Sequence, residues 1–370
     1  MTTYLLAGGG TAGHVNPLLA TADRLRERDP GATVLVLGTA EGLEARLVPP
    51  RGYELLTIPR TPFPRRPDAD LLRFPARWRA TTQAARAHLR DRGVDVVVGF
   101  GGYASAPAYR AAKREGVPIA IHEANARPGL ANRLGARLTR FVGVTFASTR
   151  LRHSRVVGFP LRVEIERLDR AASRRDGAGE FGLDASRPTL LVTGGSSGAK
   201  RINDTVVASA ALLTGAGWQV LHLSGGLRGA IDDPGLPGYR VVEYTDRMDL
   251  AFAAADLAIS RAGSATVSEL SAVGLPAVFV PYPVGNGEQA LNARDAVDAG
   301  GALLVHDAAF TPGWVAETLL PLLNDRAAVA GMAARIATVG HRDGADRMAD
   351  LVGEALASRR GSRGTGSVER

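Results

Sequence analysis

The sequence predicts an α/β protein made of two domains, each built on a doubly wound parallel sheet. Short apolar runs alternate with helical patterns along the chain, and this βαβ rhythm is typical of parallel sheets. A glycine-rich turn follows the first apolar run, at Gly8–Gly13, and a second follows the run that ends at Thr193. With 370 residues, the chain is long enough for two such domains with sizeable cores.

The apolar runs predict the strands of both sheets in chain order. In the first half they are Tyr4–Ala7, Thr33–Leu37, Leu55–Ile58, Val96–Gly99, Ile119–His122 and Val142–Thr145. In the second half they are Thr189–Thr193, Val220–Leu223, Arg240–Glu243, Leu257–Ser260, Ala277–Val280 and Leu303–Val305.

A polar stretch from Asp169 to Ser186 separates the two series and is expected to be a linker or loop. We therefore expect an N-terminal domain at 1–165 and a C-terminal domain at 166–357. Residues 358–370 are rich in Gly, Ser and Arg, so we expect a disordered tail there.

The two glycine-rich turns, Gly8–Gly13 and Thr193–Lys200, each lie between a strand and a helix. Glycines allow a tight turn and a close approach of the backbone, and the N–H groups of the next helix attract anions. The first turn matches the spacing G-x-G-x-x-G, but the strand Thr33–Leu37 ends in Gly38-Thr39-Ala40, without the acidic ribose partner that is expected directly there. Hydride transfer with a nicotinamide cofactor is therefore not favoured.

The composition limits the partners and the compartment. The net charge is +8, and the positive charge is concentrated in residues 1–165, which favours an anionic surface or substrate. The chain has no cysteine, which excludes disulfides and thiolate metal sites and fits the cytosol. We find no long apolar run and no signal-peptide pattern, so we expect neither a transmembrane helix nor secretion.

Several motifs occur in an order that resembles one family, the MurG-type GT-B glycosyltransferases, in their actinobacterial branch. The matching segments are Gly9–Pro17, Phe100–Tyr103, His122–Asn125, Gly158–Arg162, Gly194–Ala199, Ser264–Glu269 and Gly287–Ala293. The resemblance extends from about residue 4 to residue 357.

This resemblance implies two Rossmann-like domains and a defined reaction. An N-acetylglucosaminyltransferase of this type transfers GlcNAc from UDP-GlcNAc, with inversion, to the muramyl 4-hydroxyl of lipid I. The product is lipid II for peptidoglycan synthesis, and hence for cell shape and division. The C-terminal domain is expected to hold the donor and the N-terminal domain the acceptor. No cofactor, no metal and no nucleic acid is expected.

The resemblance implies that His14 is the catalytic base or a hydrogen-bond partner of the substrate. A carboxylate base is the alternative, and Glu123 is the candidate for it. An imidazole is well suited to remove a hydroxyl proton near neutral pH. Thr11, Ala12 and Gly13 are expected to contact donor or acceptor oxygens. The residues alone also allow the simpler interpretation that His14 only caps the following helix.

Further substrate contacts are expected from the remaining motifs. Tyr103 and Asn125 are assigned to the substrate-binding cleft, and Arg162 and Ser196 to diphosphate or sugar oxygens. The alternatives are loop packing for Tyr103 and Asn125 and a structural ion pair for Arg162. The family usually has Gln where this chain has Ser197, so this chain lacks the long side chain at that position.

In the C-terminal domain, Glu269 resembles the carboxylate that accepts both ribose hydroxyls of UDP, with Thr266 beside it. The alternative is an ordinary acidic residue in the first turns of a helix. Glu288 and Gln289 match the pair that contacts the hydroxyls of GlcNAc. The first of that pair is more often Gln, so Glu288 is a departure from the family pattern.

A membrane-binding segment is expected between Arg60 and Arg79. Leu71, Leu72, Phe74 and Trp78 lie among arginines there, a pattern that suits an anionic bilayer surface. The alternative is a helix that packs on the core. We expect a peripheral protein at the cytoplasmic face of the membrane. Asp68-Ala69-Asp70 matches a metal-binding Asp-x-Asp motif only by spacing, because it lies in a Pro-rich loop.

Three other functions remain to be distinguished from lipid II formation. They are a GT-B transferase that glycosylates a soluble natural product, a UDP-GlcNAc 2-epimerase, and an inert nucleotide-sugar or membrane-binding protein. The apolar segment at Leu71–Trp78 and the His122–Asn125 motif favour lipid II formation. The ordered motifs of the acceptor domain argue against the epimerase.

Overall fold

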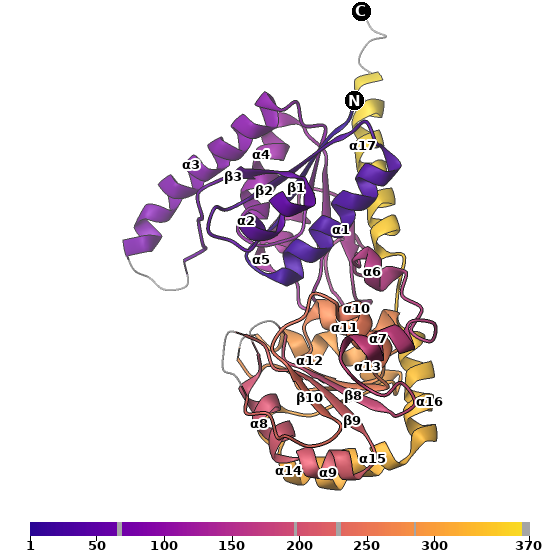
Figure 1. The fold of residues 1–370 in the computed structure, drawn as a ribbon. Coiled ribbons are helices and arrows are strands. Elements are labelled where there is room, and N and C mark those ends of the chain that lie inside the picture. Colours follow the sequence, from indigo (N-terminus) through magenta and orange to yellow (C-terminus); the bar gives the residue numbers. More distant parts are fainter. Residues whose placement is uncertain (65–68, 196–197, 227–230, 285, 365–370) are drawn as a thin grey trace, which may run out of the picture. The chain divides into compact units, whose positions relative to one another are not determined.

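The computed structural model describes residues 1–64, 69–195, 198–226, 231–284 and 286–364, and it divides into two α/β units (Figure 1). Unit 1 comprises residues Met1–Arg162 and Asp343–Arg370, and unit 2 comprises Val163–Arg342. The prediction of two Rossmann-like domains with parallel sheets is confirmed.

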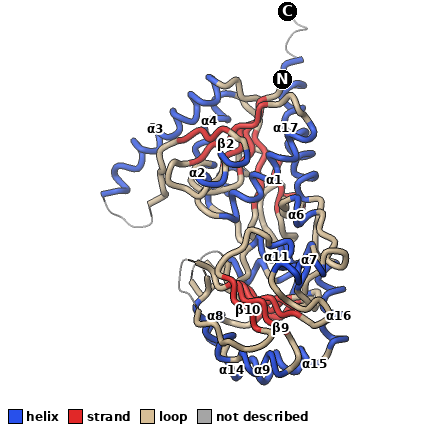
Figure 2. Tube along the Cα trace, viewed as in Figure 1, coloured by secondary structure: helices blue, strands red, loops and turns tan. Residues whose placement is uncertain are grey.

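Unit 1 contains a seven-stranded parallel sheet in the order β3-β2-β1-β4-β5-β6-β7 (Figure 2). Its elements are β1 (Thr3–Ala7), α1 (Ala12–Arg28), β2 (Thr33–Gly38), α2 (Glu44–Leu47), the 3₁₀ turn η1 (Pro49–Arg51), β3 (Glu54–Thr57), α3 (Ala69–Asp91), β4 (Val96–Gly99), α4 (Ser105–Glu115), β5 (Ile119–Glu123), α5 (Leu130–Gly135), β6 (Phe141–Val144), β7 (Ser154–Val156) and α17 (Gly344–Gly364).

Unit 2 contains a six-stranded parallel sheet in the order β10-β9-β8-β11-β12-β13. Its elements are α6 (Val163–Glu166), α7 (Arg174–Glu180), β8 (Thr189–Thr193), α8 (Lys200–Ala208), α9 (Ala210–Gly215), β9 (Gln219–Leu223), β10 (Tyr239–Val242), α10 (Met248–Ala254), β11 (Leu257–Ser260), α11 (Ser264–Ala272), β12 (Ala277–Phe279), α12 (Glu288–Asn292), α13 (Arg294–Asp298), β13 (Ala302–Leu304), η2 (Asp307–Ala309), α14 (Pro312–Trp314), the π-helical turn η3 (Val315–Leu319), α15 (Leu320–Asn324) and α16 (Arg326–Ala337).

The strand order reverses between β1 and β4 in unit 1 and between β8 and β11 in unit 2. Open α/β sheets bind ligands at such a reversal, beyond the carboxyl ends of the strands. In unit 1 these ends lead into Gly8–Gly10 and Phe100–Gly102, and in unit 2 into Gly194–Gly195 and Arg261–Gly263. The fold therefore brings the predicted motifs of each unit to one edge of its sheet.

The C-terminal helix α17 packs on unit 1, although the sequence predicted it within the C-terminal domain. Its side chains Met348, Leu351 and Val352 are buried in the same core as Leu6 and Val98 of the unit 1 sheet. Ion pairs support this packing: Asp350 Oδ1 lies 2.6 Å from the Arg28 guanidinium, and Glu354 lies 2.8 Å from that of Arg155.

The expectation of a disordered tail is wrong for residues 358–364, because α17 extends to Gly364. Arg359 holds this part of the helix by donating to the backbone carbonyls of Val94 and Asp95, at 3.3 and 3.1 Å. Residues 365–370 lie outside the described residues.

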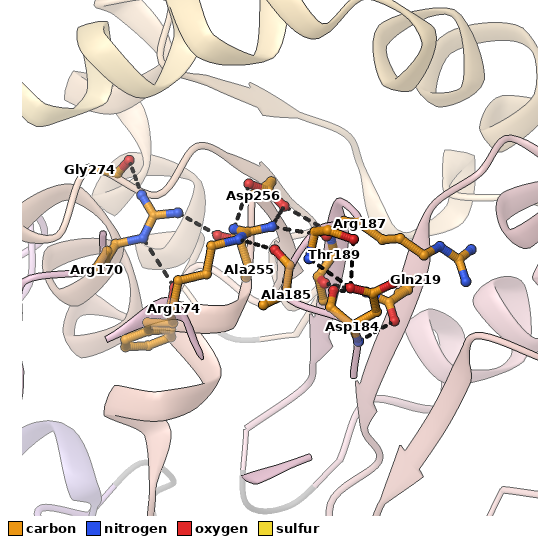
Figure 3. Close-up of polar contacts among 12 residues, drawn as sticks. Arg170, Arg174, Asp184, Ala185, Arg187, Thr189, Gln219, Ala255, Asp256 and Gly274 are labelled. Carbon is orange, nitrogen blue, oxygen red and sulfur yellow. Dashed lines mark hydrogen bonds and ion pairs between the residues drawn. The ribbon is translucent and has the colours of Figure 1, made fainter. Parts of the chain in front are cut away.

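The stretch Asp169–Ser186 is part of unit 2 rather than a linker, which corrects the sequence interpretation (Figure 3). Arg174 of α7 binds Asp256 through two hydrogen bonds of 2.9 Å. Arg170 donates to the carbonyls of Ala255 and Gly274, the second at 2.8 Å. These bonds connect the stretch to the segments around β11 and α11, so the polar residues that suggested a linker stabilise the unit instead.

Candidate functional site

A pocket of about 370 Å³ lies at the carboxyl ends of β1 and β4 in unit 1. It is lined by Gly9, Gly10, Thr11, His14, Thr39, Glu41, Gly42, Leu43, Arg60, Gly102 and Tyr103. Three residues predicted from the sequence, Thr11, His14 and Tyr103, are therefore brought together here. Ala12 and Gly13 form the first turn of α1 between Thr11 and His14.

His14 is fixed by the glycine turn that precedes its helix. Its Nδ1 lies 3.1 Å from the carbonyl oxygen of Gly9 and 3.2 Å from Oγ1 of Thr11. A Cβ atom on Gly101 would lie 3.0 Å from Nε2 and Cδ2 of His14, so a glycine at that position lets the imidazole pack against the backbone. The side chain is thus held at the carboxyl ends of the strands, where it lines the pocket.

Tyr103 pairs with Arg60 on the rim of the pocket. The guanidinium carbon of Arg60 lies 4.6 Å from the centre of the Tyr103 ring, and Nη2 donates to the phenol oxygen at 3.3 Å. Stacking on an aromatic face orients a guanidinium while leaving its edge for oxygen acceptors. Sequence reasoning did not single out Arg60, because only the folded loop brings it to Tyr103.

Glu44 is a second residue that sequence reasoning missed. The residue is 1% exposed, and its carboxylate accepts hydrogen bonds from Gly10 N, Thr39 N and Thr39 Oγ1, at 2.8, 2.8 and 2.9 Å. Burial alone raises the pKa of Glu44, but these hydrogen bonds outweigh burial and hold the pKa below its usual range. The one available signal was an acidic residue shortly after a strand end, among glycines.

Glu123, the predicted alternative base, serves its own loop in the structure. It is 2% exposed, and its two oxygens accept from the backbone N–H groups of Asn125 and Gly129 and from the Asn132 amide, each at 3.0 Å. Burial raises the pKa of Glu123 despite these hydrogen bonds. Glu123 is not among the residues that line the pocket around His14.

His122 and Asn125 flank Glu123 in the same motif. His122 is fully buried, its Nε2 lies 3.0 Å from the carbonyl oxygen of Gly158, and burial lowers its pKa to about 4. The half-buried Asn125 accepts a hydrogen bond from Thr149 at its own carbonyl, at 3.2 Å. Arg162, also half-buried, ends the first segment of unit 1. Neither Asn125 nor Arg162 lines the His14 pocket.

In unit 2, the predicted donor residues lie on two helices that follow neighbouring strands. Glu269 and Thr266 belong to α11, after β11, and Glu269 is 8% exposed. Glu288 and Gln289 open α12, after β12, and Oε1 of Gln289 accepts from the Tyr282 N–H at 2.9 Å. Ser196 and Ser197, predicted at the diphosphate, lie outside the described residues.

Arg261 is the residue of this region that sequence reasoning passed over. It follows β11 directly and donates to the carbonyls of Val280 and Pro281, at 3.0 and 3.2 Å, and to Asp307. Its guanidinium carbon also lies 5.5 Å from the Tyr282 ring centre. Arg261 thereby ties together the loops that follow β11, β12 and β13.

The predicted membrane residues lie in the N-terminal half of α3, which extends away from the unit 1 sheet (Figure 1). Leu71 and Leu72 are 48% and 85% exposed. Phe74 and Trp78 are half-buried and pack on Phe63, with ring centres 5.4 Å from it. In the C-terminal half of α3 the packing is different, because Ala85 and Leu89 enter the core.

Two further properties concern the described part of the chain only. None of its helices combines the length and the apolar character that a bilayer crossing requires. In the same residues, no three His, Asp or Glu side chains are arranged to hold a metal ion. Asp68 of the Asp-x-Asp match lies outside this part.

Models of two protein domains match the chain. The glycosyltransferase family 28 N-terminal domain matches residues 4–144, and the C-terminal domain of the same family matches residues 189–348. The chain belongs to glycosyltransferase family 28. The first matched region runs from β1 to β6 of unit 1 and the second contains all six strands of unit 2, so the predicted resemblance is confirmed for both units.

Whole-length relatives agree with this membership. A protein of Leifsonia xyli subsp. xyli is 64% identical over 97% of this chain and 100% of its own length, and one of Clavibacter michiganensis subsp. michiganensis is 64% identical over 97% and 98%. Both are named UDP-N-acetylglucosamine–N-acetylmuramyl-(pentapeptide) pyrophosphoryl-undecaprenol N-acetylglucosamine transferase. The crystal structure of Acinetobacter baumannii MurG is 28% identical and covers 96% of this chain and 100% of its own, with a TM-score of 0.79.

Proposed function

We propose that this chain transfers GlcNAc from UDP-GlcNAc to the 4-hydroxyl of the muramyl residue of lipid I, with inversion, and so forms lipid II. The observation that carries the proposal is the whole-length identity of 64% to relatives named for this transfer. Glycosylation of a soluble natural product is the weaker alternative, because those relatives act on a pyrophosphoryl-undecaprenol substrate by name.

The chemistry proposed for the site is a single displacement. The muramyl 4-oxygen bonds to the anomeric carbon of GlcNAc while the bond from that carbon to the UDP oxygen breaks, so the configuration inverts. His14 takes the hydroxyl proton in the same step, as a general base positioned at the strand ends. Its contacts with Gly9 and Thr11 support this role, whereas Glu123, with both oxygens bound to its own loop, is the less suitable base.

We also assign roles to the other predicted residues, as the family resemblance implies them. We assign Glu269 to the ribose hydroxyls of UDP, with Thr266, Glu288 and Gln289 around the donor. Tyr103 contacts the acceptor, in the pocket that it shares with His14. Ser196, Asn125 and Arg162 keep their predicted contacts with donor oxygens.

We also propose that the protein is a peripheral membrane protein that binds the cytoplasmic face of the membrane. The acceptor carries a polyprenyl chain that stays in the bilayer, so the enzyme must come to the lipid. The exposed side chains of Leu71 and Leu72 on α3 support this assignment.

The test is incubation with radiolabelled UDP-GlcNAc and a short-chain lipid I analogue, followed by identification of the product. The expected product is the disaccharide-linked lipid II analogue. His14→Ala is expected to lower kcat by about 10²–10⁴-fold, the usual contribution of general acid–base catalysis, with UDP-GlcNAc binding retained. Transfer to soluble acceptors but not to lipid I would favour the natural-product alternative, and near-normal kcat in His14→Ala would move the base role to Glu123 or to solvent.

A further inference from the structure

We propose that Glu44 is a positioning residue for His14 and acts through the peptide group that joins Gly9 to Gly10. This inference deepens the proposed function, because it rests on His14 being the base. The carboxylate, the peptide group and the imidazole form one continuous hydrogen-bonded chain that ends at the pocket.

Two hydrogen bonds define the chain, and both involve the same peptide group. Oε2 of Glu44 accepts from the N–H of Gly10 at 2.8 Å. The carbonyl oxygen of Gly9, on the other side of that peptide bond, lies 3.1 Å from Nδ1 of His14. A carbonyl oxygen only accepts, so this second contact requires the proton on Nδ1.

The surroundings of Glu44 are built for a carboxylate. A Cβ atom on Gly9 or on Gly42 would collide with the Glu44 carboxylate, so these glycines make the space that it occupies. Its other oxygen is held by the N–H and the hydroxyl of Thr39. Because these bonds keep the pKa of Glu44 below its usual range, the buried group is charged at neutral pH.

A charged acceptor polarises the peptide group between it and the imidazole. The Gly10 N–H bonded to a carboxylate makes the Gly9 carbonyl a stronger acceptor, since chains of hydrogen bonds reinforce one another at low dielectric. The proton is therefore held on Nδ1 of His14, and Nε2 becomes the basic nitrogen. In the reaction the acceptor hydroxyl proton moves to Nε2, the Nδ1 proton stays in place, and Glu44 takes up no proton.

Other titratable and polar groups also surround His14 and have to be compared with Glu44. Glu41, Arg60 and Tyr103 line the same pocket. His122, whose pKa is about 4, is neutral at pH 7, and the first turn of α1 carries no acidic residue. Thr11 competes, because its hydroxyl lies 3.2 Å from Nδ1 and would donate to it in the other tautomer. The charge of Glu44 decides between these two arrangements.

The first experiment measures the His14 ring directly by nuclear magnetic resonance. The full chain is labelled with ¹⁵N-histidine, and His14 is assigned among the seven histidines by the loss of its signals in His14→Gln. The ¹⁵N shifts of the wild type are expected to show the Nδ1–H tautomer. The other tautomer in the wild type would overturn the proposal without any Glu44 variant.

Titration then separates the charge of Glu44 from its shape. Glu44→Gln is expected to lower the pKa of His14 by at least about half a unit, because the negative charge that stabilises the imidazolium is gone. The matched control is Glu41→Gln, which removes an exposed carboxylate from the same pocket and is expected to shift the pKa less, owing to solvent screening. Equal shifts in the two variants would overturn the proposal.

Kinetics provide a readout that a purely structural role would not move. In Glu44→Gln, kcat is expected to fall about tenfold or more, the acid limb of the pH profile to move to lower pH, and the Kd of UDP to change less than twofold. Glu44→Asp keeps the charge and is expected to keep a His14 pKa close to that of the wild type, even if Glu44→Gln does not fold. An unchanged pH profile in folded Glu44→Gln would contradict the positioning role of Glu44.

The two proposals fail in different ways. The nuclear magnetic resonance measurements need no sugar acceptor. They therefore test the positioning role of Glu44 even if the sugar acceptor is not lipid I. The wild type could make no product from the lipid I analogue while the tautomer and the titration agree with expectation. In that case the proposed function fails and the positioning role of Glu44 is supported.

Discussion

Glu44 and Glu123 are buried carboxylates that each accept hydrogen bonds from backbone N–H groups, yet their pKa values move in opposite directions. Burial raises the pKa of both groups. In Glu44 the hydrogen bonds outweigh burial and the pKa falls, whereas in Glu123 burial prevails and the pKa rises. At the scale of single residues, the hydrogen bonds around a buried carboxylate therefore decide in which direction its pKa moves.

The residue for which binding gives the sharpest test is Glu269. If its carboxylate accepts the ribose hydroxyls, Glu269→Ala is expected to weaken UDP binding by about 1–3 kcal/mol, as for the loss of a hydrogen bond to a charged group. Isothermal titration calorimetry measures this. The control is Glu317→Ala, which removes an exposed carboxylate of the same unit. Unchanged affinity in a folded Glu269→Ala protein would remove Glu269 from the donor site.

At the scale of elements, helix α17 shows how a segment far along the chain completes the first unit. Leu351 and Val352 are 2% and 0% exposed, and they pack in the core that the helix shares with α1 and the unit 1 sheet. The residue Glu354, on the same helix, is exposed and bonded to Arg155. Apolar burial, rather than surface ion pairs, is expected to hold the helix in place.

This contrast can be measured with two variants of one helix. Leu351→Ala is expected to lower the free energy of unfolding by about 2–5 kcal/mol, because it leaves a cavity in the core. Glu354→Ala is expected to cost less than about 1 kcal/mol, the usual contribution of an exposed ion pair. Urea denaturation followed by circular dichroism compares them. Equal losses in the two variants would show that the helix is held mainly by its charges.

A second element-scale prediction concerns pH. His222 of β9 bonds to Tyr239 of β10 at 2.7 Å and to Asn203 of α8 at 3.1 Å, and burial lowers its pKa to about 4. In the unfolded chain the pKa returns to about 6.5, so below that pH the unfolded state takes up a proton that the folded state does not. Stability is thus expected to fall by about 2 kcal/mol between pH 7 and pH 5 through this residue alone.

Urea denaturation of the wild type and of His222→Gln at pH 7 and pH 5 tests this contribution. The variant is expected to be less stable at pH 7 but to lose less stability at pH 5, since the buried imidazole is absent. His122 has the same direction of shift in unit 1 and remains in both proteins, so it cancels in the comparison. The same loss of stability in both proteins would contradict the prediction.

The strands could be predicted from the sequence because burial on both faces of a parallel sheet leaves continuous apolar runs. All twelve predicted strands are present, with ends that coincide or differ by one residue. β7 was missed, because Ser154, Arg155 and Val156 are all exposed at the edge of the sheet. The packing of α17 on unit 1 was not predictable either, because an amphipathic helix does not reveal which sheet it covers.

In the candidate site, only the residues that belong to a recognisable sequence motif could be predicted. Thr11, His14 and Tyr103 were identified from strand-end motifs and line one pocket. Glu44 and Arg60 lie beside these residues only because separate loops bring Glu44 to Gly10 and Arg60 to Tyr103. The sequence around one residue does not reveal such contacts, because the two residues of each contact come from separate segments of the chain.

At the scale of the whole molecule, charge and exposed apolar groups coincide. The chain carries a net charge of +8, and residues 1–165 supply the positive excess. The same part of the chain exposes Leu71 and Leu72 on α3, among the exposed arginines Arg73 and Arg79. Each arginine near an anionic leaflet contributes about 1 kcal/mol, and apolar side chains add an anchor that salt does not screen.

We therefore predict binding to vesicles rich in phosphatidylglycerol or cardiolipin that weakens as salt increases. Salt screens the electrostatic share over a Debye length of about 10 Å at 0.1 M. Leu72→Asp combined with Trp78→Asp is expected to bind these vesicles poorly, because two carboxylates replace apolar groups at an anionic surface. Affinity for UDP is expected to stay unchanged, since the substituted residues lie in unit 1. Vesicle co-sedimentation and calorimetry measure the two properties.

A charge-matched control separates a specific anchor from the overall charge of the protein. Val163→Asp combined with Leu212→Asp introduces the same two charges at exposed apolar positions of unit 2 and is expected to bind vesicles nearly as well as the wild type. Equal loss in both double variants would mean that only net charge attracts the protein to the membrane. If the wild type does not bind anionic vesicles at low salt, α3 is not a membrane anchor, and an acceptor outside the bilayer becomes the better hypothesis.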